Sequence, residues 1–370
     1  MDTKASVYVR LRQEIGGIWN VEDRSLSYVF DKKKFVYNCF DNIYQNANNG
    51  CLYESDIKNS IHKFIENENV TVFAYGQTGS GKTYTMLGSD ENPGIVQLAL
   101  KEIFVLEPEK ISLSFIELFN EKIYDLYTKK ELNIYSLNNE VIIRGMHVET
   151  PKNITEALEF LRKCHGNRKN GVTEFNYDSS RSHGVFKISK ANAVLYFIDL
   201  AGSERAAKDK NRLVEGGYIN KSLLALGKLV NCSLESKKMH FRESKLTRIL
   251  QSSFEQKTNI VAICTISSLR KSVQESISTL NFAARVSNLE LKTERSDADL
   301  VPISGQNKTN SDHLKYDKII NLYKTRIENL ENLIVSLLEK NPNQTTSEIY
   351  ILEKQMFNLS LEEQAKTIEK

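Results

Sequence analysis

Apolar runs alternate with amphipathic stretches along the first three quarters of the chain. The apolar runs predict buried strands over residues 7–11, 70–75, 112–119, 184–189 and 194–199. Between them, apolar residues recur at helical spacing and predict helices over residues 51–66, 95–104, 154–164 and 218–233. Strands that alternate with helices are typical of an α/β fold built around a mostly parallel sheet.

The pattern changes after residue 293. Residues 294–315 are polar and include Pro302 and Gly305, so we interpret them as a linker. From Tyr316 to Leu337, apolar residues recur in alternating steps of four and three, which predicts a short parallel coiled coil over residues 316–340 and a weak homodimer. A helix that folds back on the preceding domain is the alternative. Pro342 ends this helix, and a weaker repeat predicts a second short helical segment over residues 341–370.

Composition narrows the class of protein. The 370 residues carry a net charge of only +3, which defines no partner by itself. The five cysteines form no Cys-x-x-Cys pair, so neither a disulfide framework nor a zinc site is expected, and free thiols fit a cytoplasmic protein. No apolar run approaches the length of a membrane span or a signal peptide.

A glycine-rich stretch follows the predicted strand at 70–75. Residues 76–83 read GQTGSGKT, and their glycines let backbone N–H groups turn inward to form an anion nest at a helix N-terminus. Lys82 supplies a positive charge for the β- and γ-phosphates, and the Thr83 hydroxyl is a ligand for Mg²⁺. The strand before it and the absence of helix breakers before Gly88 favour a phosphate-binding loop over an ordinary glycine-rich turn.

Two later stretches could sense the terminal phosphate. Asp199 ends the run 194–199, where an acidic residue can hold Mg²⁺ through water, and Gly202 can offer its N–H to a γ-phosphate. Residues 176–183 read NYDSSRSH and add hydroxyl groups and the countercharge of Arg181. Taken separately, the hydroxyl-rich stretch would be a solvated loop and residues 199–202 a helix start. Their order after the phosphate loop favours a nucleotide-driven switch.

Together these motifs resemble a kinesin motor domain. The resemblance runs from about residue 7 to residue 288 and includes FAYGQTGSGKTYTM at 73–86, DLAGSER at 199–205, EGGYINKSL at 215–223, SKLTRILQ at 244–251 and LNFA at 280–283. Residues 205–207 and 242–251 are most similar to the centromere-associated (kinesin-seven) class. The resemblance implies a motor over residues 1–293, with an eight-stranded, mostly parallel central sheet and three helices on each face.

The resemblance also assigns roles to individual residues. Thr83 and Ser180 would hold Mg²⁺, with Asp199 bonded to its waters, and Gly202 would bond the γ-phosphate. Arg181 and Glu204 would pair over that phosphate, with Glu204 accepting a proton, although a static surface ion pair is the alternative. The catalytic set is Ser179, Arg181, Gly202 and Glu204. The nucleotide set is Arg10, Arg12, Gln77, Thr78, Gly79, Ser80, Gly81, Lys82, Thr83 and Tyr84.

Two departures from the family's sequence pattern concern the adenine side of the nucleotide site and the neck linker that follows the motor. Arg10 and Arg12 resemble an Arg-x-Arg-Pro motif on the adenine side, with Gln13 in place of the proline, and Tyr84 would flank the base. No Asn-Lys-x-Asp guanine motif follows, which favours ATP over GTP. Leu291 stands where the family has an asparagine in its neck linker, which predicts weak docking of that segment.

A basic cluster follows the predicted helix at 218–233. Its members are Lys237, Lys238, Arg242, Lys245 and Arg248. Such a run is usually a solvated face. Residues 215–233, however, resemble the family's relay helix, whose movement reports phosphate loss, and a basic cluster beside that helix is better interpreted as the contact with the acidic surface of a microtubule. No aromatic residues are interleaved for base stacking, so nucleic acid is not expected as a partner.

The sequence therefore predicts a microtubule-stimulated ATPase that uses ATP and Mg²⁺ and moves along microtubules, towards the plus end. The first alternative is a kinesin-like protein that grips filaments without stepping, and the second is a P-loop ATPase that is not a motor. The expected location is the cytoplasm and cytoskeleton, with the mitotic spindle as a candidate.

Overall fold

The computed structural model describes residues 3–12, 14, 17–30, 32–89, 91–106, 111–137, 140–169, 179–204, 210–234, 237–255 and 258–291. The chain divides into two compact units, Met1–Ser296 and Asp297–Lys370. The predicted linker, coiled coil and second helical segment lie outside the described residues. They remain predictions.

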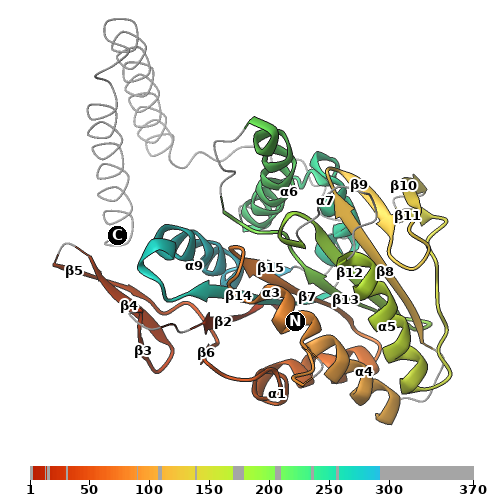
Figure 1. Cartoon of the computed structure of the whole chain (residues 1–370), viewed down its shortest axis with the longest axis horizontal. Coiled ribbons are helices and arrows are strands. Elements are labelled where there is room, and N and C mark those ends of the chain that lie inside the picture. The colour runs from red at the N-terminus through yellow and green to blue at the C-terminus, as the bar shows by residue number, and fades with distance from the viewer. Residues whose placement is uncertain are drawn as a thin grey trace, which may run out of the picture. The chain divides into compact units, whose positions relative to one another are not determined.

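One large sheet forms the centre of the first unit (Figure 1). In the part of the chain that is described, it has ten strands. Their order from edge to edge is β11 (Glu140–Arg144), β10 (Glu131–Leu137), β9 (Lys122–Asp125), β8 (Ser112–Phe119), β12 (His183–Ser189), β13 (Val194–Asp199), β7 (Asn69–Gly76), β14 (Thr258–Ser267), β2 (Ser6–Arg12) and β6 (Asn42–Gln45).

The sheet is mixed, so the prediction of a mostly parallel arrangement is wrong for half of it. The strands β13, β7, β14, β2 and β6 pair in parallel, whereas β13 with β12, β12 with β8, and the successive pairs from β8 to β11 are antiparallel. The cause is the length of the connections. Parallel neighbours need a crossover of a dozen or more residues, and the turn between β12 and β13 is closed by a hydrogen bond from Lys190 N to Ala193 O.

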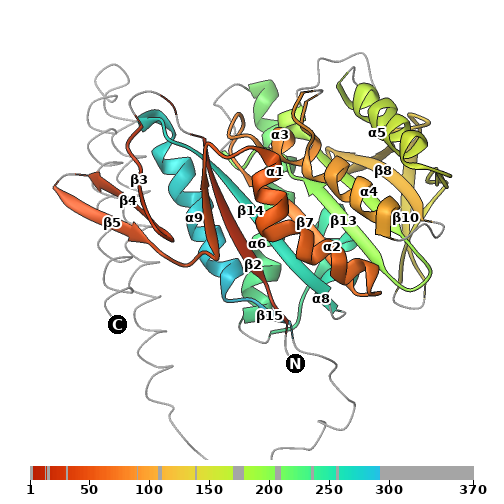
Figure 2. The same ribbon diagram turned by 90° about the horizontal axis from the view of Figure 1, so that it is seen from below.

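Two small sheets complete the strands. The three strands β3 (Asn20–Glu22), β4 (Ser25–Phe30) and β5 (Lys33–Tyr37) form an antiparallel sheet, and its β4–β5 hairpin extends away from the main sheet (Figures 1 and 2). The first strand, β1 (Thr3–Lys4), pairs with β15 (Glu290–Leu291), which joins the two ends of the unit. The hydrophobic pattern predicted none of these strands, because they are short and half-exposed.

Helices cover both faces of the large sheet. One face carries α1 (Asn49–Leu52), the π-helical turn η1 (Tyr53–Ile57), α2 (Lys58–Ile65), α3 (Lys82–Leu87), α4 (Ile95–Leu106) and α5 (Ile154–Lys169). The other carries α6 (Lys210–Leu234), α7 (Lys245–Ile249), α8 (Gln251–Glu255) and α9 (Val273–Ser287). Short 3₁₀ turns are η2 (Ser179–Arg181), η3 (Phe241–Glu243) and η4 (Arg270–Ser272). The helix predicted over residues 51–66 is therefore interrupted by a π turn, and the other predicted helices are confirmed with longer bounds.

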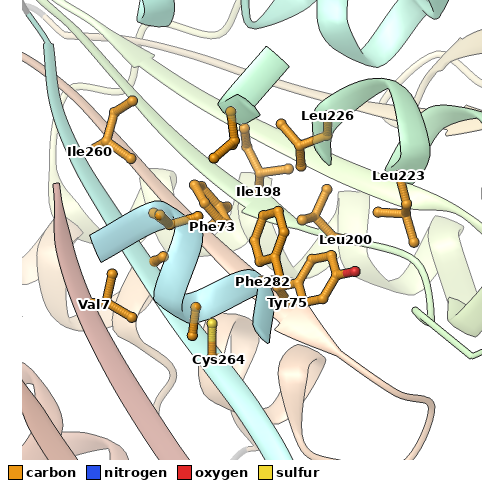
Figure 3. Close-up of a cluster of buried hydrophobic side chains, with 14 of the residues drawn as sticks. Val7, Phe73, Tyr75, Ile198, Leu200, Leu223, Leu226, Ile260, Cys264 and Phe282 are labelled. Atoms are coloured by element: carbon orange, nitrogen blue, oxygen red, sulfur yellow. The ribbon is translucent and has the colours of Figure 1, made fainter. Parts of the chain in front are cut away.

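Alternation along each central strand feeds two hydrophobic cores. In β7, Val70, Val72 and Ala74 face the first group of helices, while Phe73 and Tyr75 face the second. Figure 3 shows the second core, where the ring of Phe282 from α9 lies against Tyr75. Their centroids are 4.0 Å apart at an interplanar angle of 15°. The strand that leads into the phosphate loop is thus held from both sides.

The described residues give no sign of a membrane segment or a disulfide framework. Among them, no helix has both the length and the apolar character needed to cross a bilayer. All five cysteines are unpaired, and Cys164 and Cys264 are buried.

Candidate nucleotide and filament site

The glycine-rich stretch forms a loop between β7 and α3, as its sequence predicts. Gly79 and Gly81 have φ angles of +76° and +108°, a region that favours glycine over other residues. Ser80, on the inner side of the loop, bonds Gln77 O at 2.7 Å and Thr265 Oγ1 at 2.6 Å. These contacts fix the loop against β14.

Lys82 begins α3 and is only 6% exposed. Its ammonium donates to the carbonyl oxygens of Gly76 at 2.8 Å and Gln77 at 2.9 Å. These bonds hold a positive charge at the turn of the loop, where phosphate oxygens can replace the carbonyl partners. Binding of the β- and γ-phosphates by Lys82 remains a prediction.

Three predicted Mg²⁺ residues lie on neighbouring elements. The Thr83 hydroxyl donates to Asp199 Oδ2 at 2.7 Å, across from the end of β13. Within the described part of the chain, the other carboxylate oxygen, Oδ1, is buried and has no hydrogen-bond partner. Ser180 lies on η2, in the hydroxyl-rich stretch 176–183, hereafter the first switch. Its backbone oxygen accepts a hydrogen bond from Gly202 N in the stretch 199–205, hereafter the second switch. A hydroxyl oxygen and a buried carboxylate oxygen that lacks a partner suit a hard cation, so these residues fit Mg²⁺.

Sequence reasoning missed a buried arginine beside this site. Arg168, near the end of α5, has a side chain that is 1% exposed. It donates to Asp199 Oδ2 at 2.6 Å and to Ser182 O at 3.0 Å, and Glu117 Oε1 lies 3.4 Å from its Nε. Ser182 in turn donates to Glu117 at 2.5 Å. This buried network fixes the carboxylate of Asp199 relative to the first switch.

His183, at the end of the first switch, forms hydrogen bonds with the second switch and with α6. Its Nδ1 accepts from the backbone N–H of Ala201 at 3.0 Å, so its Nε2 carries the proton and donates to Ser222 Oγ at 2.8 Å. Burial, helped by the nearby charges of Arg168 and Lys82, lowers the pKa of His183 to about 3. The imidazole is therefore neutral in the folded protein.

This neutral histidine predicts a loss of stability in acid. Below about pH 6.5, His183 takes up a proton in the unfolded chain but stays neutral in the folded protein. The free energy of unfolding should therefore decrease as the pH is lowered from about 6.5 to about 3. Burial also lowers the pKa of His165, to about 4, in the same direction. Urea unfolding of His183→Asn between pH 7.5 and pH 5.5 should show a shallower pH dependence. His240→Asn, at an exposed position, is the control and should keep the original slope.

The second switch is folded against both the first switch and the phosphate loop. Gly202 N donates to Ser180 O at 2.7 Å, and Ser203 N donates to Gly76 O at 3.1 Å. A side chain at Gly202 would collide with the side chains of Thr78 and Glu204, so the contact between those two residues depends on a glycine at this position. The backbone of this segment can therefore respond to a change at either neighbour.

Glu204 lies on the phosphate loop in this structure. Its carboxylate accepts from Thr78 N at 2.8 Å and also from the Thr78 hydroxyl. The pair predicted with Arg181 remains a prediction, as does the catalytic role of Ser179. The contact brings the predicted proton acceptor directly to the loop that would bind the nucleotide.

Of the two arginines predicted on the adenine side of the nucleotide site, Arg10 is half-buried and Arg12 is exposed. The guanidinium of Arg10 bonds Thr85 Oγ1 at 2.8 Å, Ala47 O at 2.7 Å and Asn49, and burial lowers its pKa. It also lies 5.2 Å from the ring centroid of Tyr84, which is 39% exposed. Arg10 is thus a positioning residue for the Tyr84 ring. Arg12 is more exposed and donates to Gly79 O at 2.7 Å.

The basic cluster follows α6 on the opposite side of the sheet from α1–α5. Lys237, Lys238 and Arg242 are exposed, while Lys245 and Arg248 are half-buried on α7. A capping box between Ser244 and Thr247 starts α7 and fixes its direction. Arg248 Nη2 donates to Ser136 Oγ at 2.9 Å, so this arginine is partly engaged within the domain. The exposed members lie at the surface of the domain.

Comparisons with known proteins agree with these motifs. Residues 14–289 match the family described as "Kinesin motor domain". The chain is 35% identical over 323 residues to the kinesin-like protein KIN-7N of Arabidopsis thaliana, with 77% of this chain covered. It spans only 39% of that relative's length.

Solved structures are similar over most of the chain. The structure of a fast kinesin has a TM-score of 0.72 at 28% identity and covers 83% of this chain and 99% of its own. A KIF14 dimer with AMP-PNP, in complex with a microtubule, has a TM-score of 0.70 at 26% identity and covers 80% and 96%.

Proposed function

The chain belongs to the kinesin motor domain family, and on that basis we propose that it is a microtubule-stimulated ATPase that couples hydrolysis to movement along the filament. The observation that carries this proposal is the position of the second switch. Its backbone bonds the first switch through Gly202 and the phosphate loop through Ser203. Loss of the γ-phosphate from between these segments would release the second switch and the helix α6 that follows it.

The chemistry of the site supports ATP and Mg²⁺ as its ligands. Mg²⁺ would be held by Thr83, Ser180 and, through water, Asp199, and when bound it would neutralise charge on the phosphate oxygens. Lys82 would bind the β- and γ-phosphates, and Gly202 would donate its N–H to the γ-phosphate. Glu204 would accept the proton of the attacking water. The similar KIF14 structure holds AMP-PNP, which supports a nucleotide in this loop.

The partner we propose is the microtubule, bound through the basic cluster. The KIF14 structure is a complex with a microtubule, and this chain places three exposed cations after α6, the helix that follows the second switch. The proposed setting is the cytoskeleton, with the mitotic spindle suggested by similarity to the kinesin-seven class. Movement towards the plus end and a weak homodimer through residues 316–340 are also part of the proposal.

A second candidate is a kinesin that grips microtubules without stepping. The observation that favours it is the exit from the motor, where Leu291 stands in place of the family's asparagine. A neck linker without this asparagine would dock weakly. Single-molecule motility and surface gliding distinguish this candidate, because a gripping protein binds filaments but moves none.

Steady-state ATPase with and without polymerised tubulin tests the proposal. We expect turnover to rise on addition of microtubules, and the rise to be lost in a Lys237→Ala/Lys238→Ala/Arg242→Ala variant whose basal turnover is unchanged. Binding of the wild type should weaken with salt, since exposed charges act over a screening length of about 10 Å at 0.1 M salt. If the ATPase rate is the same with and without microtubules, the chain is a P-loop ATPase that is not a motor. Unchanged co-sedimentation of the triple variant at every salt concentration would place the filament contact elsewhere.

A further inference from the structure

A cavity lies at the other end of the central strands from the phosphate loop. Its volume is about 310 Å³, and it is bounded by the sheet, by β11 and by α8. It shares no residue with the nucleotide site described above. Pockets for small molecules begin at about this size.

The strand register places a row of polar side chains across the floor of this cavity. Ser114 on β8 pairs with Lys187 on β12, Lys187 pairs with Tyr196 on β13, and Tyr196 pairs with Thr71 on β7. All four line the cavity. The next row on the same face, towards the phosphate loop, is Ile116, Val185, Ile198 and Phe73, which is wholly apolar. The polar row therefore marks the point where the apolar inner face ends, since the next row outward contains Ser112 and Ser189.

Within this row, Lys187 has no anionic partner among the described residues. In the described part of the chain, its ammonium makes no hydrogen bond or ion pair, and its only close polar contact is with the ring of Tyr196, 5.9 Å from the centroid. Burial lowers the pKa of Lys187. A lysine half-enclosed without an acceptor destabilises the fold, so packing alone does not account for it.

Some of the other polar side chains that line the cavity have hydrogen-bond partners, and one does not. Thr71 bonds Ser253 at 2.7 Å, and Glu255, at the edge, accepts from Gln251 at 2.8 Å. The Thr258 hydroxyl has no partner among the described residues, but it is fully buried and lies on β14, three strands from Lys187 on β12. The side that faces the cavity thus presents one cation and hydroxyl donors next to apolar side chains such as Val185 and Ile143.

We propose that this cavity binds a small organic carboxylate, with its carboxyl group on Lys187 and its apolar body against Val185 and Ile143. The cation selects an anion, and the apolar wall selects one with a hydrocarbon part rather than an inorganic ion. Glu255 is the other charged group that lines the cavity, and its negative charge opposes such a ligand. The proposal does not depend on motor activity.

The test uses benzoate as the probe and the whole chain saturated with Mg·ADP, which fills the proposed nucleotide site. Benzoate should bind by calorimetry and raise the melting temperature, whereas neutral benzamide should do neither. Lys187→Met should weaken benzoate binding roughly tenfold to a hundredfold, the range for a lost hydrogen bond to a charged group. Glu255→Gln should strengthen it. Lys101→Met, at an exposed site on α4, is the matched control and should bind as the wild type does.

Three outcomes would overturn the proposal. They are equal binding of benzoate by Lys187→Met, equal binding of benzamide, and binding of inorganic phosphate at Lys187 without binding of benzoate. None of these measurements involves microtubules or turnover, so they leave the proposed motor function untouched. The melting temperatures of Lys187→Met and the wild type without benzoate also show whether burial of the Lys187 ammonium destabilises the fold, in which case the variant melts at the higher temperature.

Discussion

Replacing Glu204 with alanine is expected to slow ATP hydrolysis on the order of a hundredfold or more while ATP still binds. The carboxylate lies on Thr78 of the phosphate loop, where it can position water and accept its proton, and losses of this size are typical for such groups. Lys82→Ala should instead lose nucleotide binding itself, because this ammonium is the cation held on the loop. Fluorescent-nucleotide binding and single-turnover hydrolysis measure the two steps separately.

Glu204→Gln separates positioning from proton transfer. The amide oxygen can still accept from Thr78 N, but the side chain cannot take a proton, so this variant should hydrolyse as slowly as Glu204→Ala. Glu66→Ala, at an exposed site beyond α2, is the control. Turnover near that of the wild type in Glu204→Ala would remove Glu204 from the mechanism.

Removing the charge of Arg168 is expected to cost about 3 to 5 kcal/mol of the free energy of unfolding, the range for breaking a buried ion pair. Arg168→Met would leave the carboxylates of Asp199 and Glu117 buried without their cation. Arg168→Lys keeps the charge but cannot reach all three partners, so its loss should be intermediate. Arg162→Met, at an exposed position on the same helix, should cost little. Urea unfolding measures all three variants.

A second measurement separates positioning from stability. Because Arg168 fixes Asp199, Arg168→Lys should also weaken the Mg²⁺ dependence of nucleotide binding under conditions where the protein is fully folded. A loss below about 1 kcal/mol in Arg168→Met, with normal Mg²⁺ dependence, would show that the network is not required.

Local signals made the phosphate loop predictable. The glycines, Lys82 and Thr83 act through the backbone and through immediate neighbours, so their spacing in the sequence fixes their geometry. The strand predicted before the loop and the helix after it are both present, as β7 and α3. The fold class and the family followed from the same motifs.

The residues that sequence reasoning missed depend on contacts far along the chain. Arg168 resembles any solvated cation near a helix end, and only the folded α5 brings it to Asp199 and Glu117. For Arg10, whose place on the adenine side remains a prediction, the bonds to Ala47, Asn49 and Thr85 could not be foreseen. The polar row through Lys187 could not be predicted either, because it spans four strands whose order is set by topology.

The pairing of β1 with β15 has a mechanical consequence. A pull on the chain beyond Leu291 would load this ladder, in which the described residues form two pairs. Behind that ladder stands Leu289, which is 1% exposed and whose carbonyl accepts from Ala5 N at 3.1 Å. Ala5 leads directly into β2, and Arg12 at the end of β2 holds Gly79 of the phosphate loop. Tension applied at the exit would therefore be borne by the strand that also supports the nucleotide loop, so mechanical load and nucleotide affinity should influence each other.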